Sequence, residues 1–199
     1  MITLLDFAAL AVGLVYILLE YRASIWVWAA GIVMPAIDLW LYWERGLYGD
    51  FGLAVYYLGA GLYGYMAWRS TGRTSGGRTP SPPVITHFPP GLLPIARLLA
   101  VFLAVWAGVW AFLACWTDST VPVTDSLTNA LSIVGLWMLS RKYVEQWYVW
   151  IVADAVYVWL YAHKGLPFKS ALYALYIIIA FFGLRRWLRM MREASPRDA

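Results

Sequence analysis

One stretch of the sequence, QWYVWIVADAVYVWLY at residues 146–161, sets a carboxylate among residues suited to an apolar environment. Side chains able to bind a solute recur through it at steps of three and four residues: Gln146, Trp150, Asp154, Tyr157 and Tyr161. This spacing places them on one stripe of a helix. A carboxylate at the centre of a bilayer costs about 2.5–3.5 kcal/mol even on the lenient insertion scale. We therefore expect the stripe to face inward, with Asp154 as a structural partner, an acceptor for a ligand, or a proton relay.

Two other predicted helices carry polar groups of the same kind. Asp38 follows Pro35, which is expected to break or kink its helix and free a backbone carbonyl. Asn129 either holds neighbouring helices together or contacts a ligand, because a buried amide needs partners. Trp28 and Trp147 lie where they could form walls beside the carboxylates. Aromatic walls near a carboxylate suit a flat, uncharged or cationic ring, through stacking and cation–π attraction of about 0.5–2 kcal/mol each.

The composition places these residues in membrane helices. Hydrophobic residues make up 62% of the 199 residues and charged residues 13%, against roughly 25% charged in soluble domains. A spanning helix needs about 20 mostly apolar residues. Seven segments qualify: 3–21, 24–43, 47–68, 92–116, 124–140, 144–163 and 166–188. The lone cysteine, Cys115, excludes an intramolecular disulfide and is interpreted as apolar filler. The sequence thus predicts an all-α membrane protein.

The cations indicate how the chain crosses the membrane. Twelve of the 15 Lys and Arg residues fall on the side reached after the first, third, fifth and seventh segments. Because Lys and Arg in short loops mark the cytoplasmic side, the N-terminus is predicted outside and the C-terminus inside. With an even number of spans the Lys and Arg residues would no longer fall mainly on one side, so their distribution also favours an odd number.

The second half of the chain repeats the first at an offset of 119 residues. Trp28 aligns with Trp147, and Trp68 with Trp187, within an alignment that needs no gap. We interpret the match as two parallel three-helix repeats in a 3+1+3, SWEET-like arrangement, with a substrate near the midplane between them. Duplication in a purely structural membrane protein is the alternative. The predicted parts are a first repeat (1–68), a flexible cytoplasmic linker (69–91), a linker transmembrane helix (92–118), a second repeat (119–188) and a basic cytoplasmic tail (189–199).

Two motifs in the second repeat resemble a known family. E-x-W-x-x-W-I-x-x-D ends at Asp154 and L-Y-x-x-K-G-L follows it; residues 125–187 and 25–68 resemble the two halves of the PnuC-type nicotinamide riboside transporters. The resemblance implies a facilitator of the bacterial inner membrane that takes up nicotinamide riboside and assembles as a homo-oligomer such as a trimer. A separate cytoplasmic kinase would keep the solute inside by phosphorylating it. The family's aromatic and amide positions fall on Trp28, Asn129, Trp147, Trp150, Asp154 and Tyr157.

Two positions depart from the family pattern. Leu136 precedes Trp137 where members commonly carry Gln, and Asp38, which we include among the substrate-binding candidates, stands where members often lack an acid. Thiamine or another vitamin-like cationic ring is therefore the alternative substrate, and a scaffold without transport is a more remote alternative. An enzyme is not expected, because neither Asp38 nor Asp154 lies in a G-x-G-D context and the sequence has no G-x-x-x-x-G-K-[ST] loop. We also expect no cofactor, no metal ion and no nucleic-acid partner.

Overall fold

The computed structural model describes residues 4–44, 48–71, 85–116, 121–163, 165 and 167–194, without the side chains of residues 4–10, 38, 41, 42, 48–50 and 71. This part of the chain forms seven α-helices: α1 (Leu4–Tyr21), α2 (Trp26–Glu44), α3 (Tyr48–Thr71), α4 (Leu92–Trp116), α5 (Pro122–Ser140), α6 (Gln146–His163) and α7 (Pro167–Ala194). Each helix corresponds to one predicted segment, so the all-helical prediction is confirmed. α2 continues through Pro35, so of the two predicted effects the break does not occur, and the kink stays a prediction.

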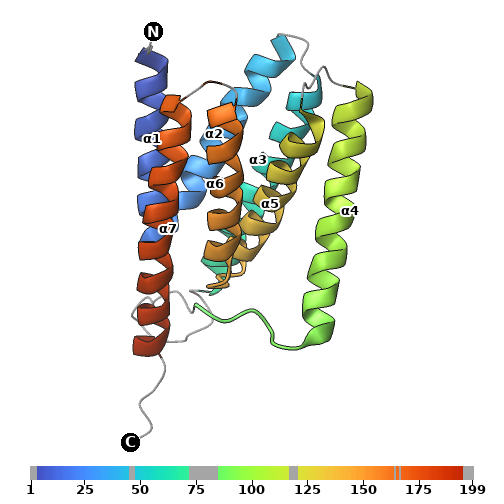
Figure 1. The fold of residues 1–199 in the computed structure, drawn as a ribbon. Helices are drawn as coiled ribbons and strands as arrows, with labels where there is room; N and C mark the ends of the chain where they lie inside the picture. Colours follow the sequence, from blue (N-terminus) through green and yellow to red (C-terminus); the bar gives the residue numbers. More distant parts are fainter. Residues whose placement is uncertain are drawn as a thin grey trace, which may run out of the picture.

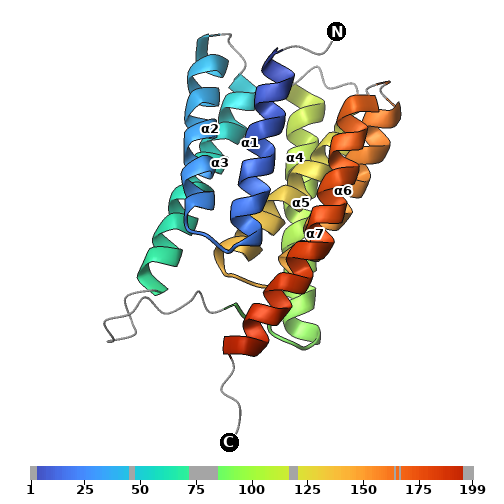
Figure 2. The same cartoon turned by 90° about the vertical axis from the view of Figure 1, so that its left-hand side faces the viewer.

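The seven helices lie side by side in one bundle (Figures 1 and 2). α6 packs along α7, α2 packs along α3, and α5 contacts both α4 and α6. Contacts of α1 with α7, and of α3 with α5, join the first three helices to the last three. α1 begins at one end of the bundle and α7 finishes at the other (Figure 1), as an odd number of helices requires. We call the end at which α1, α3, α5 and α7 terminate the basic end, after Arg22, Arg69 and Arg141.

The helices differ in how apolar they are. α4 and α7 are long and apolar enough to cross a membrane by length and composition alone. No residue of α4, all of which is described, is buried within the chain, and this helix stands at the edge of the bundle (Figure 1). α5 and α6 instead bury Ser, Thr, Gln and Asp side chains. Their lower hydropathy therefore comes from polar residues that face protein, which is where a membrane protein can hold them.

A tryptophan at the start of α2 packs this helix against α3, and another at the start of α6 packs that helix against α7; we call α1–α3 the first half and α5–α7 the second half. Trp28 of α2 is fully buried, and its ring meets that of Trp68 on α3 edge to face, with centroids 5.6 Å apart and planes at 84°. The indole lies directly over Gly64, where a Cβ atom would overlap the ring. The close approach of the indole therefore requires glycine at residue 64. The ring itself is large and fully buried, so it contributes much of the apolar burial here.

The second half repeats this arrangement with the residues 119 positions on. Trp147 of α6 is fully buried, and it meets Trp187 of α7 at 5.7 Å between centroids and 90° between planes. A Cβ atom on Gly183 would overlap the Trp147 ring. Because the second ring of each pair lies forty residues after the first, the repeat seen in the sequence corresponds to the same packing in both halves.

Two indoles, those of Trp68 and Trp187, form hydrogen bonds that connect the halves at the basic end. Trp68 donates from Nε1 to the carbonyl oxygens of Leu139 and Ser140 at 3.3 and 3.2 Å, at the end of α5. Trp187 donates from Nε1 to the carbonyl oxygen of Glu20 at 3.0 Å, at the end of α1. These carbonyls lie in the last turn of a helix, and those of Glu20 and Leu139 also accept from the backbone N–H groups of Ala23 and Lys142. The second tryptophan of each half therefore caps the first helix of the other half.

The chain leaves both capped helices through a residue with left-handed backbone. Ala23 follows α1 with φ of 49°, and Lys142 follows α5 with φ of 58°. The Lys142 ammonium lies 5.0 Å from the centre of the Trp68 ring, and burial lowers the pKa of this group. The cation–π contact compensates part of the cost of burying the charge.

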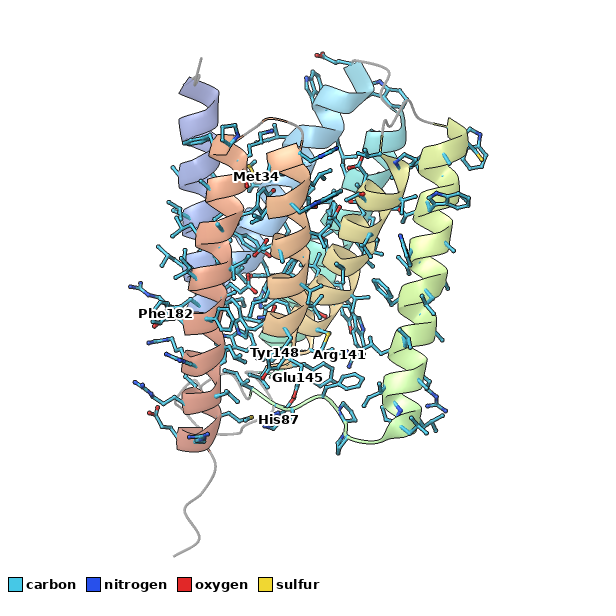
Figure 3. All side chains as sticks on the ribbon, in the orientation of Figure 1. Met34, His87, Arg141, Glu145, Tyr148 and Phe182 are labelled. Atoms are coloured by element: carbon cyan, nitrogen blue, oxygen red, sulfur yellow. The ribbon has the colours of Figure 1, made fainter. Side chains whose placement is uncertain are left out.

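The end of the predicted linker packs against the turn between α5 and α6. Thr86 donates its backbone N–H to the carbonyl of Lys142 at 3.1 Å and accepts from the N–H of Val144 at 3.0 Å. His87 Nδ1 lies 2.7 Å from a carboxylate oxygen of Glu145 (Figure 3). We call this segment, residues 85–91, the strap.

The strap, which is the last part of the linker predicted at residues 69–91, is held against the rest of the protein. Ile85 is buried, and the N–H of Phe88 donates to the second carboxylate oxygen of Glu145 at 2.7 Å. Residues 69–71 belong to α3, and residues 72–84 lie outside the described part of the chain. The Gly, Ser and Pro content that predicted flexibility is concentrated before the strap, whose own residues supply hydrogen bonds and apolar burial.

Candidate functional site

The stripe on α6 faces the interior of the bundle. Asp154 is 7% exposed and Gln146 is 0% exposed, while Trp150 and Tyr157 are partly buried. The opposite face of the same helix presents Trp159, which is 59% exposed. A carboxylate facing other helices does not have to be placed in lipid. The inward orientation expected from the spacing is what the structure has.

A second carboxylate, which the sequence analysis missed, approaches the stripe from the other half. Glu20 lies in the last turn of α1 and is 3% exposed. Its side chain interacts with those of Gln146 and Trp150, and its charge acts on Asp154. An acidic residue at the end of a predicted span is naturally interpreted as part of the membrane surface. The repeat offered one clue to Glu20: its counterpart 119 residues later is the apolar Leu139, so an acid at this position is not part of the duplicated pattern.

The hydrogen bonds of Gln146 leave one of its atoms unused. Its Oε1 accepts from Trp150 Nε1, one turn further along α6. Gln146 Nε2 and Glu20 Oε1 are buried, and neither has a hydrogen-bond partner among the described residues. A buried polar atom without a partner costs about 1–3 kcal/mol. Such a cost at two neighbouring side chains marks a place where a ligand group can bind.

Tyrosine rings line the stripe beyond Asp154. Tyr157 stacks on Tyr173 of α7 with centroids 4.6 Å apart and planes at 25°. Tyr161 stacks on the same Tyr173 ring at 5.3 Å. Tyr176, next along α7, meets Tyr173 edge to face at 5.6 Å. The stack combines flat apolar faces with hydroxyl groups, which suits an aromatic solute with a polar edge.

Asn129 on α5 joins helices, as one of its two predicted roles requires. Its Nδ2 donates to the carbonyl of Asp125 at 2.8 Å, and its Oδ1 accepts from the hydroxyl of Tyr57 on α3 at 3.4 Å. The second bond crosses from one half to the other. Ligand contact by Asn129 stays a prediction. The side chain is only partly buried, and its hydrogen bond with Tyr57 is long, at 3.4 Å.

Trp28 and Trp147 occupy positions different from the rest of the predicted site. Both are fully buried in the paired indole packing of their own halves, and the Nε1 atom of each has no hydrogen-bond partner in the described part of the chain. A solute could touch either ring only after the neighbouring helix moved away. Their role in substrate binding therefore stays a prediction. The side chain of Asp38 lies outside the described residues.

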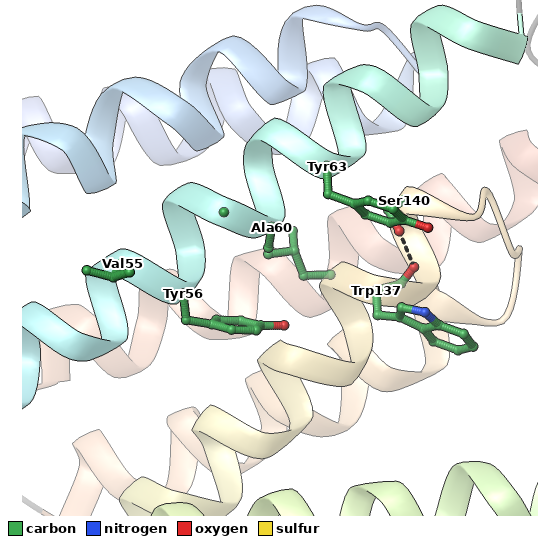
Figure 4. A pocket seen from close by; sticks show the side chains of 8 residues that line it. Val55, Tyr56, Ala60, Tyr63, Trp137 and Ser140 are labelled. Carbon is green, nitrogen blue, oxygen red and sulfur yellow. Dashed lines mark hydrogen bonds between the residues drawn. The ribbon is translucent and has the colours of Figure 1, made fainter.

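Two hollows in the structure lie away from the stripe. A cleft of about 350 Å³ between α3 and α5 is lined by Val55, Tyr56, Gly59, Ala60, Tyr63, Leu136, Trp137 and Ser140 (Figure 4). A larger one, about 600 Å³, lies between α4, α5 and the strap and includes Arg97. Both linings are mainly apolar, which suits lipid chains better than a polar solute. Leu136, where the family often carries Gln, belongs to the first cleft.

Metal binding finds no support in the described residues. No three His, Cys, Asp or Glu side chains in this part of the chain come together so that they could hold a metal ion. The inward groups are instead carboxylates, amides, indoles and phenols. Their chemistry is that of binding a neutral or cationic aromatic molecule through stacking and hydrogen bonds.

Comparisons with known proteins agree on one family. Residues 3–189 match the family model described as nicotinamide mononucleotide transporter. The riboflavin/roseoflavin transporter RibM of Streptomyces davaonensis is 26% identical over 96% of this chain and 88% of its own length. The nicotinamide riboside transporter PnuC of Escherichia coli is 25% identical over 79% of this chain and 73% of its own.

One solved structure has the same fold. The crystal structure of the vitamin B3 transporter PnuC matches with a TM-score of 0.70 at 19% identity, covering 94% of this chain and 81% of that one. At this identity the match concerns the arrangement of the helices.

Proposed function

Because this chain belongs to the nicotinamide mononucleotide transporter family, we propose that it takes up nicotinamide riboside across a bacterial inner membrane by facilitated diffusion. The observation that carries the proposal is the one-sided stripe of α6. Asp154, at 7% exposure, lies on that stripe between the Trp150 indole and the tyrosines that stack on α7. The pyridinium ring of the substrate is flat and cationic, and the attached ribose supplies hydroxyl donors.

Each part of the stripe has a role in this proposal. Trp150 and Tyr157 stack on the pyridinium ring, and each such contact contributes about 0.5–2 kcal/mol. Asp154 balances the ring's charge or accepts from the ribose hydroxyls, and in a desolvated site a charge-assisted bond is stronger than in water. Asn129 takes a further hydroxyl when the substrate displaces Tyr57.

We also propose the 3+1+3 arrangement of parallel repeats, with the N-terminus outside and the C-terminus in the cytoplasm. The duplicated indole packing and the reciprocal bonds of Trp68 and Trp187 support two equivalent halves. Alternating access then follows from rocking one half against the other. Assembly as a homo-oligomer such as a trimer, and trapping of the substrate by a separate cytoplasmic kinase, complete the proposal.

Riboflavin is the second candidate substrate. The relative RibM, a riboflavin/roseoflavin transporter, matches 96% of this chain. The uncharged flavin ring would stack on the same side chains but gain less from Asp154. Thiamine, the alternative drawn from Leu136 and Asp38, would gain from Asp154 as nicotinamide riboside does, because its ring is also cationic.

Uptake into proteoliposomes tests the function. Purified protein should accumulate nicotinamide riboside inside vesicles loaded with a riboside kinase and ATP, and without the kinase should only equilibrate it. Riboflavin and thiamine are measured in parallel, with empty vesicles and with the Gly31→Ala variant as controls. A Cβ atom at Gly31 would meet no described atom within 4 Å, so this variant should transport normally. Equal flux in empty and protein-containing vesicles for all three solutes would refute a transport function.

The native cysteine tests the orientation. Cys115 is exposed near the end of α4, and the proposal places this end at the outer surface of the inner membrane. A membrane-impermeant maleimide added to intact cells should label it, and the Cys115→Ser variant should not be labelled. Labelling seen only after the cells are lysed would contradict the proposed orientation.

A further inference from the structure

The partnerless atoms of Glu20 and Gln146 have complementary chemistry. Glu20 Oε1 is a hydrogen-bond acceptor and Gln146 Nε2 is a donor, and both are buried. Glu20 lies in the last turn of α1 and Gln146 begins α6, and the Gln146 amide acts on the Glu20 carboxyl group without meeting the geometry of a hydrogen bond. A ligand group would reach these buried atoms only when α1 and α6 move apart, as when one half rocks against the other, and it must offer a donor to the first and an acceptor to the second.

Both side chains are held in place by other bonds. Gln146 Oε1 accepts from Trp150 Nε1, so the amide is oriented with Nε2 as its free atom. The carbonyl of Glu20 accepts from Trp187 Nε1 at 3.0 Å, which fixes the last turn of α1. Fully buried Val27 and Trp147 belong to the same packed region. Recognition of this kind depends on such preorganised donors and acceptors.

We propose that Glu20 and Gln146 form a subsite for an N–H group beside a carbonyl on the substrate's ring, such as the carboxamide of nicotinamide riboside. This inference rests on the proposed function and adds specificity-determining residues to it. The carboxamide N–H donates to Glu20 Oε1, and its C=O accepts from Gln146 Nε2. The ring then lies along Trp150, with the ribose toward Asp154. The pyrimidine edge of riboflavin, an N–H between two carbonyls, offers the same chemistry.

The subsite predicts discrimination against a carboxylate. Nicotinic acid riboside carries a carboxylate in place of the carboxamide, so it has no N–H donor to offer Glu20 Oε1. A site built to receive a donor rejects analogues that lack it, because its buried acceptor is then left unpaired. The wild-type protein should therefore bind the amide at least about tenfold more tightly than the acid.

The experiment measures dissociation constants of the full-length protein by tryptophan fluorescence and calorimetry. The ligands are nicotinamide riboside, nicotinic acid riboside, riboflavin and N3-methylriboflavin, which distinguish the two sources of the group. Glu20→Gln, which keeps the shape and can both donate and accept, should reduce the amide-to-acid ratio about tenfold. Gln146→Leu should weaken the amide at least tenfold, and Gly31→Ala should change neither ratio nor affinity.

The readout separates specificity from structure. If Glu20 only stabilised the fold, its substitution would weaken both ribosides by the same factor. An unchanged ratio in folded Glu20→Gln protein, or an unchanged affinity for the amide in folded Gln146→Leu protein, overturns the subsite. If Glu20→Gln does not fold, it is replaced by Glu20→Asp, which keeps the carboxyl group but shortens its reach and should weaken the amide more than the acid. Absence of binding by wild-type protein to any of the four ligands would instead refute the proposed function. Sensitivity to N3-methylation, lost in Glu20→Gln, would identify the flavin as the group recognised.

Discussion

In the first half of the chain an indole at residue 28 lies over Gly64 and against Trp68, and in the second half the indole at residue 147 lies over Gly183 and against Trp187. The second tryptophan of each half then caps a helix of the other. These devices are the same on both sides because they solve the same packing problem twice.

The polar residues are distributed differently. Gln146, Trp150 and Asp154 correspond, 119 residues earlier, to Val27, Gly31 and Pro35. In the second half, Asn129 and Ser132 likewise replace Leu10 and Gly13. The halves thus share a scaffold, and the inward chemistry is concentrated in the second half, with Glu20 as the first half's contribution. A solute with one polar end and one ring is better matched by such an asymmetric site than by two equal ones.

Asp154→Asn should show the largest difference between substitutions in the two halves. Loss of a charge-assisted bond costs about 1.5–3 kcal/mol, so binding of nicotinamide riboside should weaken about ten- to a hundredfold. Its counterpart change, Pro35→Ala, should leave affinity within about threefold. Calorimetry on both purified variants measures the difference, and equal losses in the two would show that the halves contribute alike.

Gly64→Ala and Gly183→Ala should have matching effects. In each case the new Cβ overlaps a buried indole, and overpacking of this kind costs about 1–3 kcal/mol. Thermal unfolding in detergent should show both variants destabilised to a similar extent, whereas Gly31→Ala is tolerated sterically. A large loss in one glycine variant with none in the other would break the equivalence of the two packing arrangements.

Trp68→Phe and Trp187→Phe remove the bonds between the halves. Each change removes the indole N–H donor that links the two halves, and a hydrogen bond of this kind contributes about 0.5–1.5 kcal/mol. Trp68→Phe should cost slightly more, because Trp68 also faces the Lys142 ammonium and Trp187 has Ala23 at the equivalent place. Denaturation of the single and double variants measures this. Strong non-additivity would mean that the two caps act as one unit.

Glu145→Gln tests the contact between the strap and the turn after α5. The residue of the first half that corresponds to Glu145 is Trp26, an exposed tryptophan, which cannot form such an ion pair. The pair with His87 is partly exposed, so its loss should cost at most about 1 kcal/mol. Hydrogen exchange at Phe88 should become faster, while transport stays unchanged. His87→Ala is the matched variant that removes the other partner, and a loss of transport in both would assign the strap a role beyond anchoring.

The helices could be predicted because each is recorded locally. Seven apolar runs separated by charged or Gly-containing turns gave seven helices whose ends differ from the predicted ranges by a few residues. The spacing of three and four residues from Gln146 to Tyr161 was sufficient to orient α6 inward. The strap could not be predicted, because the bonds of residues 86–88 go to a turn more than fifty residues away.

The candidate site was predictable only in part. Asp154 and Trp150 stood out as polar or aromatic residues on one stripe, whereas Glu20 resembled an ordinary charge at a membrane surface. Trp28 and Trp147 were predicted to be walls beside the carboxylates, but the sequence alone does not distinguish an aromatic wall of a site from a ring inside packed protein. The packing becomes visible only in three dimensions, where Gly64 and Gly183 lie against these rings although each is 36 residues further along the chain.

The sequence by itself determined the number of helices, their apolar character, the division of cations and the duplication at an offset of 119 residues, because periodicity and composition act along the chain. The tertiary structure alone decided which polar atoms meet. Glu20 and Gln146 come together because α1 packs against α7, which in turn packs along α6. Burial then withdraws their free atoms from water, and this depends on neighbours that no local pattern specifies.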